Sequence, residues 1–271
     1  MPAPPKLFDR DLHRKRLDRA AGGYAGADFL HRRAAFDIAE RLAPIMRTFS
    51  LAVDLSARGG AFAEALAEEA PGKVGTLIEA DLSHRMLTGR AGLRLVADEE
   101  RLPFAPASFD LVVSTLGLHW TNDVVGALIQ ARRALKPDGL FIGAFLGGTT
   151  LTELRQSLVA AESEILGGAG SRVSPFADVQ DASGLLGRAG FVQPVTDVDK
   201  VTVTYEHPLK LIYDLRQMGE TSVLADRHPK KLTRPLLART AELYAERFGT
   251  PDGRTPATFE ILTLTGWAPR G

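Results

Sequence analysis

The chain has 271 residues, 45% hydrophobic and 24% charged, which is typical of a globular protein long enough to bury a substantial core. Lysine plus arginine equals aspartate plus glutamate at 33 each, so the charge balance gives no support for binding nucleic acid or a membrane surface. Cysteine is absent, which excludes disulfide bonds, thiolate zinc sites and a cysteine nucleophile and fits a reducing compartment.

The N-terminal region is expected to form helices over 7–19 and 27–44, because apolar residues recur there at helical spacing. Its first residues are basic but lack the apolar centre of a signal peptide. A mitochondrial transit peptide is normally poor in acids, and this segment contains Asp9, Asp11 and Asp18. No apolar run approaches the roughly 20 residues that span a bilayer. We therefore expect a cytoplasmic protein without a membrane span, or a matrix protein only if a transit peptide has been removed.

Short apolar strands alternate with helices through the middle of the chain. Strands are expected at 50–55, 74–81, 93–98, 108–117 and 140–145, and helices at 61–70, from Ser83 onwards and at 122–135. A KPDG turn separates the last helix from the last strand. Strands that alternate with helices at this spacing indicate a parallel sheet with helices on both faces.

After Gly148 the pattern changes to helices at 151–167, 178–189, 207–219 and 229–248, with strands at 201–205 and 257–268. We predict an α/β fold with a doubly wound (Rossmann-like), mostly parallel seven-stranded sheet whose last strand is antiparallel. The predicted single domain, 1–271, divides into N-terminal helices (1–45), a cofactor-binding half (46–148) and a C-terminal half (149–271). In the last part, the helices of 207–248 are expected to form a cap inserted before the last strand.

Acidic residues end successive predicted strands, and ligands bind at the carboxyl ends of the strands in this architecture. Asp54 opens the loop SARGG, where glycine allows a close approach of backbone to ligand, although such glycines also occur for steric reasons alone. Asp81, in an acid pair with Glu79, can accept both hydroxyls of a ribose or can cap a helix at Ser83. Asp98 can accept a hydrogen bond from an adenine amino group or can serve as a turn residue.

Four segments match, in order, the successive motifs of class I S-adenosylmethionine-dependent methyltransferases: AVDLSARGG, LIEADLSHRML, VADEERLPFAPASFDLVVSTLGLHW and ARRALKPDGLFIGAF. The chain resembles this family. The resemblance implies S-adenosyl-L-methionine as cofactor and S-adenosyl-L-homocysteine as product. The residues expected to bind the cofactor are Asp54, Ser56, Arg58, Gly60, Asp81, Leu82, Asp98, Glu99 and Ser114.

The first motif departs from the family pattern of an acid followed by three glycines at alternate positions. Ser56 and Arg58 replace the first two glycines, and Gly60 stands in register. If Ser56 must adopt a positive φ, this costs on the order of 1 kcal/mol or more. The Arg58 side chain either crowds the methionine end of the ligand, folds away, or pairs with the carboxylate of the ligand.

A second resemblance extends over essentially the whole chain. The start LFDRDLHRKRLDRAA and the later segments GGTTLTELRQSLVAAE, RVSPFADVQDASGLLGRAGF, YEHPLKLIYDLRQMGE and DGRTPATFEILTLTGW are similar to the mitochondrial complex I assembly factors known as arginine hydroxylases and to their bacterial relatives. This implies a methyltransferase fold that acts on an arginine of a complex I subunit carrying an iron–sulfur cluster, by hydroxylation rather than methyl transfer. The residues themselves do not show hydroxylation. Two alternatives stay open: an assembly factor with a decayed cofactor loop, and a carboxyl methyltransferase of an acyl-carrier substrate.

The sequence does not identify catalytic residues. His119 and Trp120 follow the fourth predicted strand and are candidates for substrate contact, although packing explains them equally well. Asn122 and Asp123 are expected to cap the next helix. The six histidines are scattered, without the spacing of a His/His/carboxylate iron site, so no metal is expected.

The C-terminal half contains further candidates for a substrate-facing wall, 174–176 (Ser-Pro-Phe) and 218–220 (Met-Gly-Glu). Glu220 or Asp214 can hold a substrate guanidinium through paired hydrogen bonds, and each is also explained as a solvated carboxylate at a helix end. A basic cluster is a candidate surface for an acidic partner, although charge runs are usually solvated surface: Arg227, His228, Lys230, Lys231 and Arg234.

Overall fold

The computed structural model describes residues 6–226 and 232–270. In these residues a seven-stranded sheet is formed by β1 (Phe49–Asp54), β2 (Val74–Asp81), β3 (Leu93–Val96), β4 (Phe109–Thr115), β5 (Leu135–Leu146), β6 (Val192–Tyr205) and β7 (Thr255–Trp267). The strand order is β3-β2-β1-β4-β5-β7-β6, and β7 runs antiparallel to both neighbours while the other pairs are parallel. The predicted seven-stranded, doubly wound sheet with an antiparallel last strand is confirmed.

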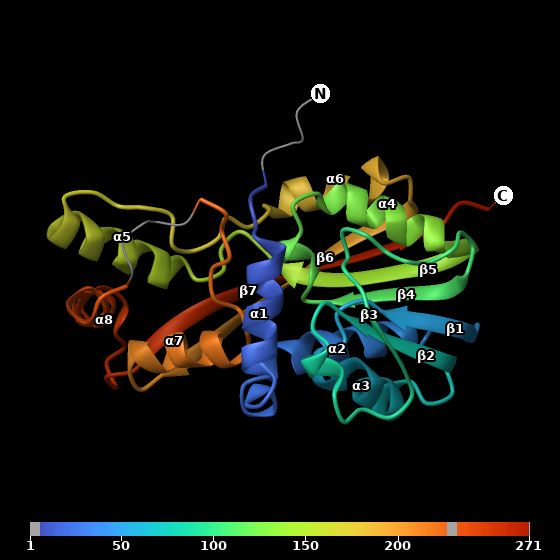
Figure 1. The fold of residues 1–271 in the computed structure, drawn as a ribbon, viewed down its shortest axis with the longest axis horizontal. Coiled ribbons are helices and arrows are strands. Elements are labelled where there is room, and N and C mark those ends of the chain that lie inside the picture. The colour runs from blue at the N-terminus through green and yellow to red at the C-terminus, as the bar shows by residue number, and fades with distance from the viewer. Residues whose placement is uncertain (1–5, 227–231, 271) are drawn as a thin grey trace.

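Helices cover both faces of this sheet (Figure 1). Helices α2 (Phe29–Leu42) and α3 (Ala61–Glu69) lie on one face, and α4 (Val124–Ala134) and α6 (Val179–Arg188) lie on the other. Successive side chains of a strand point to opposite faces, so Val113 packs in the first core and Val112 in the second. This explains why the central strands are almost continuously apolar in sequence.

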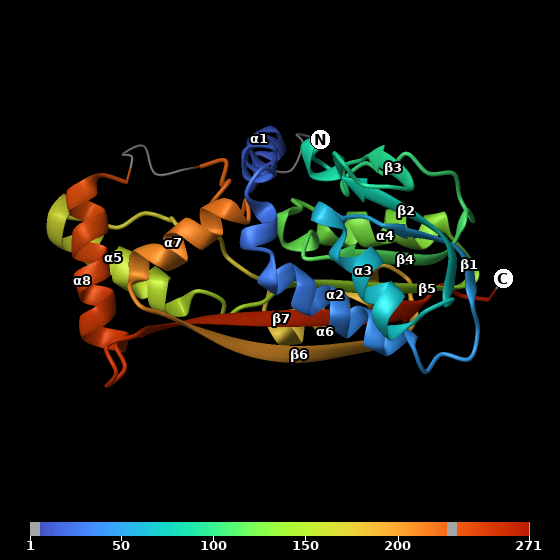
Figure 2. The ribbon, with the colours of Figure 1, turned by 90° about the horizontal axis from the view of Figure 1, so that it is seen from below.

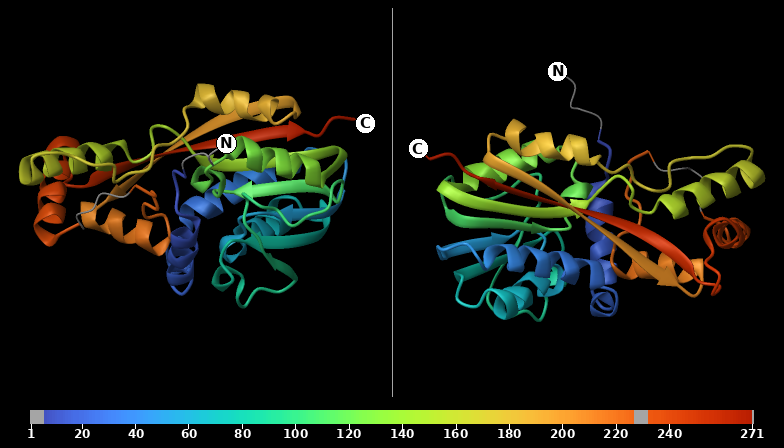
Figure 3. Two further views of the ribbon diagram at one scale, coloured as in Figure 1. Left: turned by 45° about the horizontal axis from the view of Figure 1, so that its top comes forward. Right: turned by 180° about the vertical axis from the view of Figure 1, so that it is seen from behind.

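Strands β6 and β7 extend well beyond the other strands, and three helices gather around the extension (Figures 2 and 3). These helices are α5 (Thr152–Leu166), α7 (Pro208–Gln217) and α8 (Arg234–Phe248). Helix α1 (Arg10–Ala20) stands between this group and the main body, in front of the edge where the parallel strands end (Figure 1). The carboxyl ends of the strands therefore face α1 and the helical group.

Several local predictions differ from the structure. The KPDG segment, expected as a turn before the strand at 140–145, lies inside β5, which begins at Leu135 directly after α4; Asp138 adopts φ of 60° where the register with β4 shifts. The helix expected from Ser83 is only a 3-10 turn, Arg85–Leu87, because Gly89 and Gly92 follow at φ 78° and 91°. The strand expected at 201–205 begins already at Val192, since an edge strand keeps exposed polar residues and loses the apolar pattern that predicts strands. Within residues 6–226 and 232–270, none of the helices has the length and apolar character needed to cross a membrane.

Candidate functional site

Acidic side chains converge at the carboxyl edge of the sheet, where the strand order reverses between β1 and β4. Asp54 and Asp81 are the last residues of β1 and β2, and Asp98 follows the end of β3. Asp54 and Asp81 are each 1% exposed. The structure thus brings together the strand-end acids that the sequence separates by 27 and 17 residues (81 − 54 and 98 − 81). This edge of the sheet, called the crevice below after its counterpart in other doubly wound sheets, is the usual ligand position of that architecture.

The loop after β1 turns through the left-handed region at Arg58, Gly59 and Gly60, with φ of 24°, 74° and 84°. A β-carbon is crowded in this region, whereas glycine adopts it freely. Ser56 is not among the described residues with positive φ, so the strain considered for this position does not arise. Arg58 carries the strain instead, at a cost on the order of 1 kcal/mol.

Asp81 holds this loop in place. Its Oδ2 accepts a hydrogen bond from the backbone N–H of Arg58 at 3.1 Å, and its Oδ1 accepts one from that of Ser83 at 2.7 Å. Burial raises the pKa of Asp81 to about 6, although Arg58 and these hydrogen bonds oppose the rise. Burial also raises the pKa of Asp54 well above its ordinary value. The buried carboxyl groups of Asp54 and Asp81 therefore lie at the carboxyl ends of β1 and β2, where a further hydrogen-bond donor would stabilise their ionised forms.

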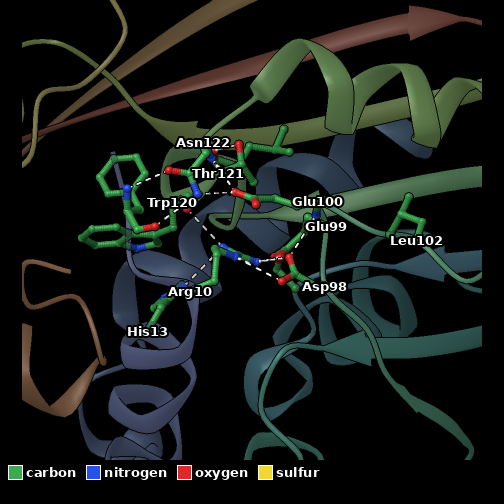
Figure 4. Close-up of polar contacts among 12 residues, drawn as sticks. Arg10, His13, Asp98, Glu99, Glu100, Leu102, Trp120, Thr121 and Asn122 are labelled. Carbon is green, nitrogen blue, oxygen red and sulfur yellow. Dashed lines mark hydrogen bonds and ion pairs between the residues drawn. The ribbon is translucent and has the colours of Figure 1, made fainter. Parts of the chain in front are cut away.

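Arg10 reaches over the crevice from the first turn of α1 (Figure 4). Its guanidinium contacts Asp98 at 2.6 Å, pairs with Glu99 and donates to the carbonyl oxygen of Trp120 at 3.1 Å. Glu99 also accepts a hydrogen bond from Ser56 Oγ at 3.0 Å. Attraction to the acids exceeds the effect of burial, so the pKa of Arg10 is raised. Sequence reasoning did not single out Arg10, which lies 88 positions before Asp98.

Asn122 fastens the segment before α1 to the same edge (Figure 4). Its Oδ1 accepts the backbone N–H of Phe8 at 2.7 Å, and its Nδ2 donates to the Phe8 carbonyl at 3.2 Å and to Glu100 at 2.9 Å. The predicted capping role of Asn122 is therefore wrong. Asp123 is the N-cap of α4 as predicted, and it accepts a hydrogen bond from the N–H of Gly126 at 2.8 Å.

A second buried ion pair joins Arg58 to Glu220, which follows α7; their side chains are 3% and 9% exposed. Arg58 binds Oε1 of Glu220, and Oε2 accepts hydrogen bonds from Trp120 Nε1 at 2.7 Å and from His119 Nε2 at 3.0 Å. Burial opposes ionisation of Glu220, but attraction to Arg58 and His119 outweighs it and holds the pKa of Glu220 far below its usual range. Glu220 is thus a fixed anion, and its explanation as a solvated helix-end carboxylate is wrong.

His119 and Trp120 lie in a 3-10 turn after β4 and converge on this carboxylate. The backbone N–H of Leu146 points at His119 Nδ1 over a long 3.5 Å contact. An ionised carboxylate can only accept, so Nε2 of His119 donates the hydrogen bond to Glu220. Both residues also pack against aromatic neighbours, with 5.4 Å between the ring centres of Phe8 and Trp120. The two residues therefore have a packing role and a polar role together.

Buried histidines that the sequence did not single out surround the same ion pair. In the described part of the chain, Nε2 of His13 is buried without a hydrogen-bond partner, and the ring nitrogens of His31 are buried with no partner in regular hydrogen-bond geometry, the backbone of Ser56 being a polar neighbour that opposes the lowering of the His31 pKa by burial. His31, Arg58 and Glu220 line a cavity of about 20 Å³, which is room for about one water molecule. Burial, together with Arg58, lowers the pKa of His31 to about 3. Unpaired buried polar atoms are costly, so these nitrogens indicate a place for a ligand or water.

A larger cavity of about 460 Å³ opens on the other side of Glu220. Its wall is mostly apolar and includes Leu154 and Leu158 of α5 and Ile212 and Leu215 of α7. This volume lies within the usual range of small-molecule sites.

The polar part of the wall comes from several segments. Trp120, Glu220, Arg16 and Arg172 contribute there, as does Ser174 of the predicted wall segment, while Phe176 of that segment adds to the apolar wall. Arg16 donates to Thr221, and Arg172 donates to Glu162 at 2.6 Å. Met218 lines the smaller cavity instead.

The other sequence candidates lie nearby but contribute in different ways. Gly60 is the N-cap of α3, and a Cβ there would lie 1.7 Å from the guanidinium of Arg90. That guanidinium also binds Glu79 at 3.0 Å, so Glu79 is an ion-pair partner beside the loop. Leu82 packs in a small apolar cluster beside α1. Ser114 Oγ lies 3.5 Å from Ser56 Oγ.

The remaining candidates are away from the crevice. Asp214 lies on α7 beside Tyr205. Arg234 is the exposed first residue of α8, whereas the rest of the predicted basic cluster, Arg227, His228, Lys230 and Lys231, lies outside the described residues. Among the described residues, no group of three or more His, Asp or Glu side chains is placed to hold a metal ion.

Comparisons with known proteins extend this picture. The family model of a methyltransferase domain matches residues 53–143. The mitochondrial arginine-hydroxylase NDUFAF5 of Danio rerio is 40% identical over 270 residues, which cover 97% of this chain and 83% of that protein. A malonyl-[acyl-carrier protein] O-methyltransferase of Gallionella capsiferriformans is 31% identical over 277 residues, 97% of this chain and 92% of that protein.

A solved structure agrees in fold. Phosphoethanolamine N-methyltransferase 2 of Haemonchus contortus, in complex with S-adenosyl-L-methionine, superimposes with a TM-score of 0.58. The match covers 95% of this chain and 60% of that chain at 17% identity. At this identity the likeness concerns the arrangement of the sheet and its helices.

Proposed function

This chain belongs to the family of class I S-adenosylmethionine-dependent methyltransferases, in the group that contains the arginine-hydroxylase NDUFAF5 proteins, and we propose that it modifies an arginine side chain of a protein partner. It is an enzyme, and S-adenosylmethionine is its cofactor. By resemblance, the partner is a complex I subunit that carries an iron–sulfur cluster. A purely structural assembly factor is not favoured, because the matched relatives in both groups are named as enzymes.

The residues of the crevice fit the cofactor group by group, and we assign them on that basis. We assign Asp81, the last residue of β2, to the ribose hydroxyls, and Asp98, which follows β3, to the adenine amino group. Arg58 is a buried cation that matches the carboxylate at the methionine end. The unpaired nitrogens of His31 beside Arg58 are consistent with a missing polar neighbour. S-adenosylmethionine, when bound, supplies a methyl group on a sulfonium sulfur.

The larger cavity carries the proposal that arginine is the target. An arginine side chain has an apolar stem and a planar cationic head, and this cavity has apolar walls with one carboxylate, Glu220, on them. Glu220 touches both His119 and Trp120, the two candidates for substrate contact. We therefore assign the wall at Glu220 to the head of the substrate arginine.

The test uses the purified chain with S-adenosylmethionine and the complex I iron–sulfur subunit of the same organism. Mass spectrometry of the recovered subunit is expected to show one modified arginine. A methyl group would assign methyl transfer from S-adenosylmethionine. An added oxygen atom would assign hydroxylation, the reaction in the name of the NDUFAF5 proteins, and because S-adenosylmethionine supplies no oxidant, this arm of the test contains dioxygen and a two-electron reductant. If the subunit stays unmodified although the protein in a parallel sample is shown to bind the cofactor, the proposed target is wrong. The matched variant is Asp81→Asn, which removes the charge and one of the two acceptor oxygens and is therefore expected to weaken the proposed ribose contact.

A carboxyl methyltransferase remains the second candidate, since Arg16 places a cation on the cavity wall and the acyl-carrier relative is 31% identical. Incubation with malonyl-[acyl-carrier protein] is expected to give no methyl ester. A methyl ester would replace arginine as the target.

We further propose that the chain works as a single domain, with 46–148 as the cofactor half and 207–248 as the cap. Its lack of cysteine favours a cytoplasmic location.

A further inference from the structure

Glu220 stands in the wall between two cavities of different character. On one side it shares the small cavity with Arg58 and His31, next to the loop after β1. On the other side it lines the apolar cavity of about 460 Å³ with Trp120 and Phe176. A single buried carboxylate therefore faces both the cofactor side and the substrate side.

The two oxygens of Glu220 are bound in different ways. Oε2 is held by His119 Nε2 and Trp120 Nε1, both from the 3-10 turn after β4. Oε1 is held by Arg58, whose long side chain rises from a backbone with φ of 24°. The Oε2 side is thus anchored to the turn after β4 by two hydrogen bonds, whereas the Oε1 side is held by the side chain of Arg58.

We propose that Glu220 changes partners during the binding cycle: the carboxylate of the cofactor draws Arg58 away, and Oε1 then holds the guanidinium of the substrate arginine. Cofactor binding thereby prepares the substrate site and precedes substrate binding. This inference rests on the proposed function, because it assumes an arginine substrate and S-adenosylmethionine as cofactor.

Charge pairing sets this order. A buried charge without a partner is strongly unfavourable, and two buried cations cannot share one carboxylate oxygen without repulsion. If the substrate guanidinium arrived first, it would meet Glu220 already paired with Arg58. If the cofactor carboxylate arrives first, Arg58 keeps an anionic partner and Glu220 is left to receive the next cation. The first step replaces the Arg58–Glu220 pair by a pair between Arg58 and the cofactor, and Glu220 then keeps only the hydrogen bonds from His119 and Trp120. The second step gives Glu220 a new cationic partner.

The cavity offers one carboxylate to the head of an alkyl guanidinium. Glu220 is the single acid among the described lining residues. The two lining arginines are bound by their own chain, Arg16 by Thr221 and Arg172 by Glu162. The leucines of α5 and Phe176 offer apolar contact to the stem of the ligand.

Calorimetric titration with hexylguanidinium tests the coupling in the full chain. We expect S-adenosylhomocysteine at saturation to tighten hexylguanidinium binding on the order of tenfold, and hexylguanidinium to tighten S-adenosylhomocysteine by the same factor. Hexan-1-ol, which has the chain without the cation, is expected to show no such coupling. Equal hexylguanidinium affinity with and without S-adenosylhomocysteine would overturn the exchange. Tighter binding of hexanoate than of hexylguanidinium would overturn the assigned substrate charge.

Arg58→Gly gives an independent readout, because glycine accepts the positive φ and Glu220 is then left without its cation. This variant is expected to bind hexylguanidinium in the absence of S-adenosylhomocysteine, and hexylguanidinium is expected to raise its melting temperature. The matched control is Lys136→Ala, which removes the cation paired with Asp110 at the start of β4, away from the carboxyl ends of the strands. Hexylguanidinium should not change the melting temperature of this control. A folded Arg58→Gly protein that ignores hexylguanidinium would contradict the proposal.

If Arg58→Gly does not fold, Glu220→Gln decides the question. This variant keeps the shape of the side chain and should lose the enhancement of hexylguanidinium binding by S-adenosylhomocysteine. Retained enhancement would refute a role for the Glu220 charge. The two proposals fail separately. Arginine modification without coupling would remove only the exchange, whereas coupling without arginine modification would remove only the proposed target.

Discussion

Replacing Arg10 by alanine tests whether the ion pair over the crevice stabilises the fold. The Arg10 side chain is 11% exposed, and its partners Asp98 and Glu99 are 30% and 5% exposed. Removing one partner of a buried ion pair costs about 3–5 kcal/mol, since the other charge stays buried alone. Asp98 keeps part of its hydration, so we expect Arg10→Ala to lower the free energy of unfolding by about 2–4 kcal/mol.

Urea denaturation followed by circular dichroism measures this loss. Arg14→Ala on the same helix is the matched control, because Arg14 and its partner Asp11 are 50% and 81% exposed, and it should cost less than about 0.5 kcal/mol. Adding Glu99→Gln to Arg10→Ala should restore about 1 kcal/mol or more, because it removes the stranded charge and keeps an acceptor for Ser56. A loss below about 1 kcal/mol in Arg10→Ala, or no recovery in the double variant, would refute the reasoning.

Two further predictions concern the floor of the crevice. Asp81 has a folded-state pKa of about 6, raised from 3.8, so its contribution to stability is complete below pH 3.8 and is lost as the pH rises through 6. This loss of stability amounts to about 3 kcal/mol. The free energy of unfolding of Asp81→Asn, measured in urea at successive pH values, should not show the loss. A pH profile identical to that of the unchanged protein would contradict the prediction. In Gly117→Ala the new Cβ would lie 1.9 Å from Ser56 Oγ, so we expect a loss of about 1–3 kcal/mol, while Gly184→Ala in α6, which has open space, should gain about 0.5–1 kcal/mol. Equal melting temperatures for these two glycine variants would show that Ser56 moves aside at no cost.

The fold could be predicted because its signals are local. The central strands are short apolar runs buried on both faces, as Val112 and Val113 show by packing in different cores. Acids at the strand ends fix which edge of the sheet carries the site, and the spacing of Asp54, Asp81 and Asp98 follows from the length of each strand–helix unit. Where the local signal weakens, the prediction fails, as in the polar edge strand from Val192 and the glycine-ended turn after Ser83.

The contents of the site depend on contacts between distant parts of the chain, and these have no local signal. Arg10 reaches Asp98 from 88 residues away, and Arg58 reaches Glu220 from 162 residues away. Nothing in the composition of α1 distinguishes Arg10 from the other basic residues of that helix. Glu220 also resembled a solvated carboxylate in sequence, because its burial is produced by α1, the turn after β4 and the loop after β1 together.

The substituted loop after Asp54 is better explained as a modified site than as a decayed one. A decayed loop would be expected to lose its demanding geometry, yet Arg58 retains a positive φ that costs on the order of 1 kcal/mol. The same residue is 3% exposed and forms a buried ion pair, which a drifting surface loop would not maintain. Asp81 still accepts the backbone N–H of Arg58, so the loop keeps its hold on the second strand. The strain at Arg58 is therefore tied to the pairing with Glu220, and loss of Glu220 should leave the strained conformation without its main compensation.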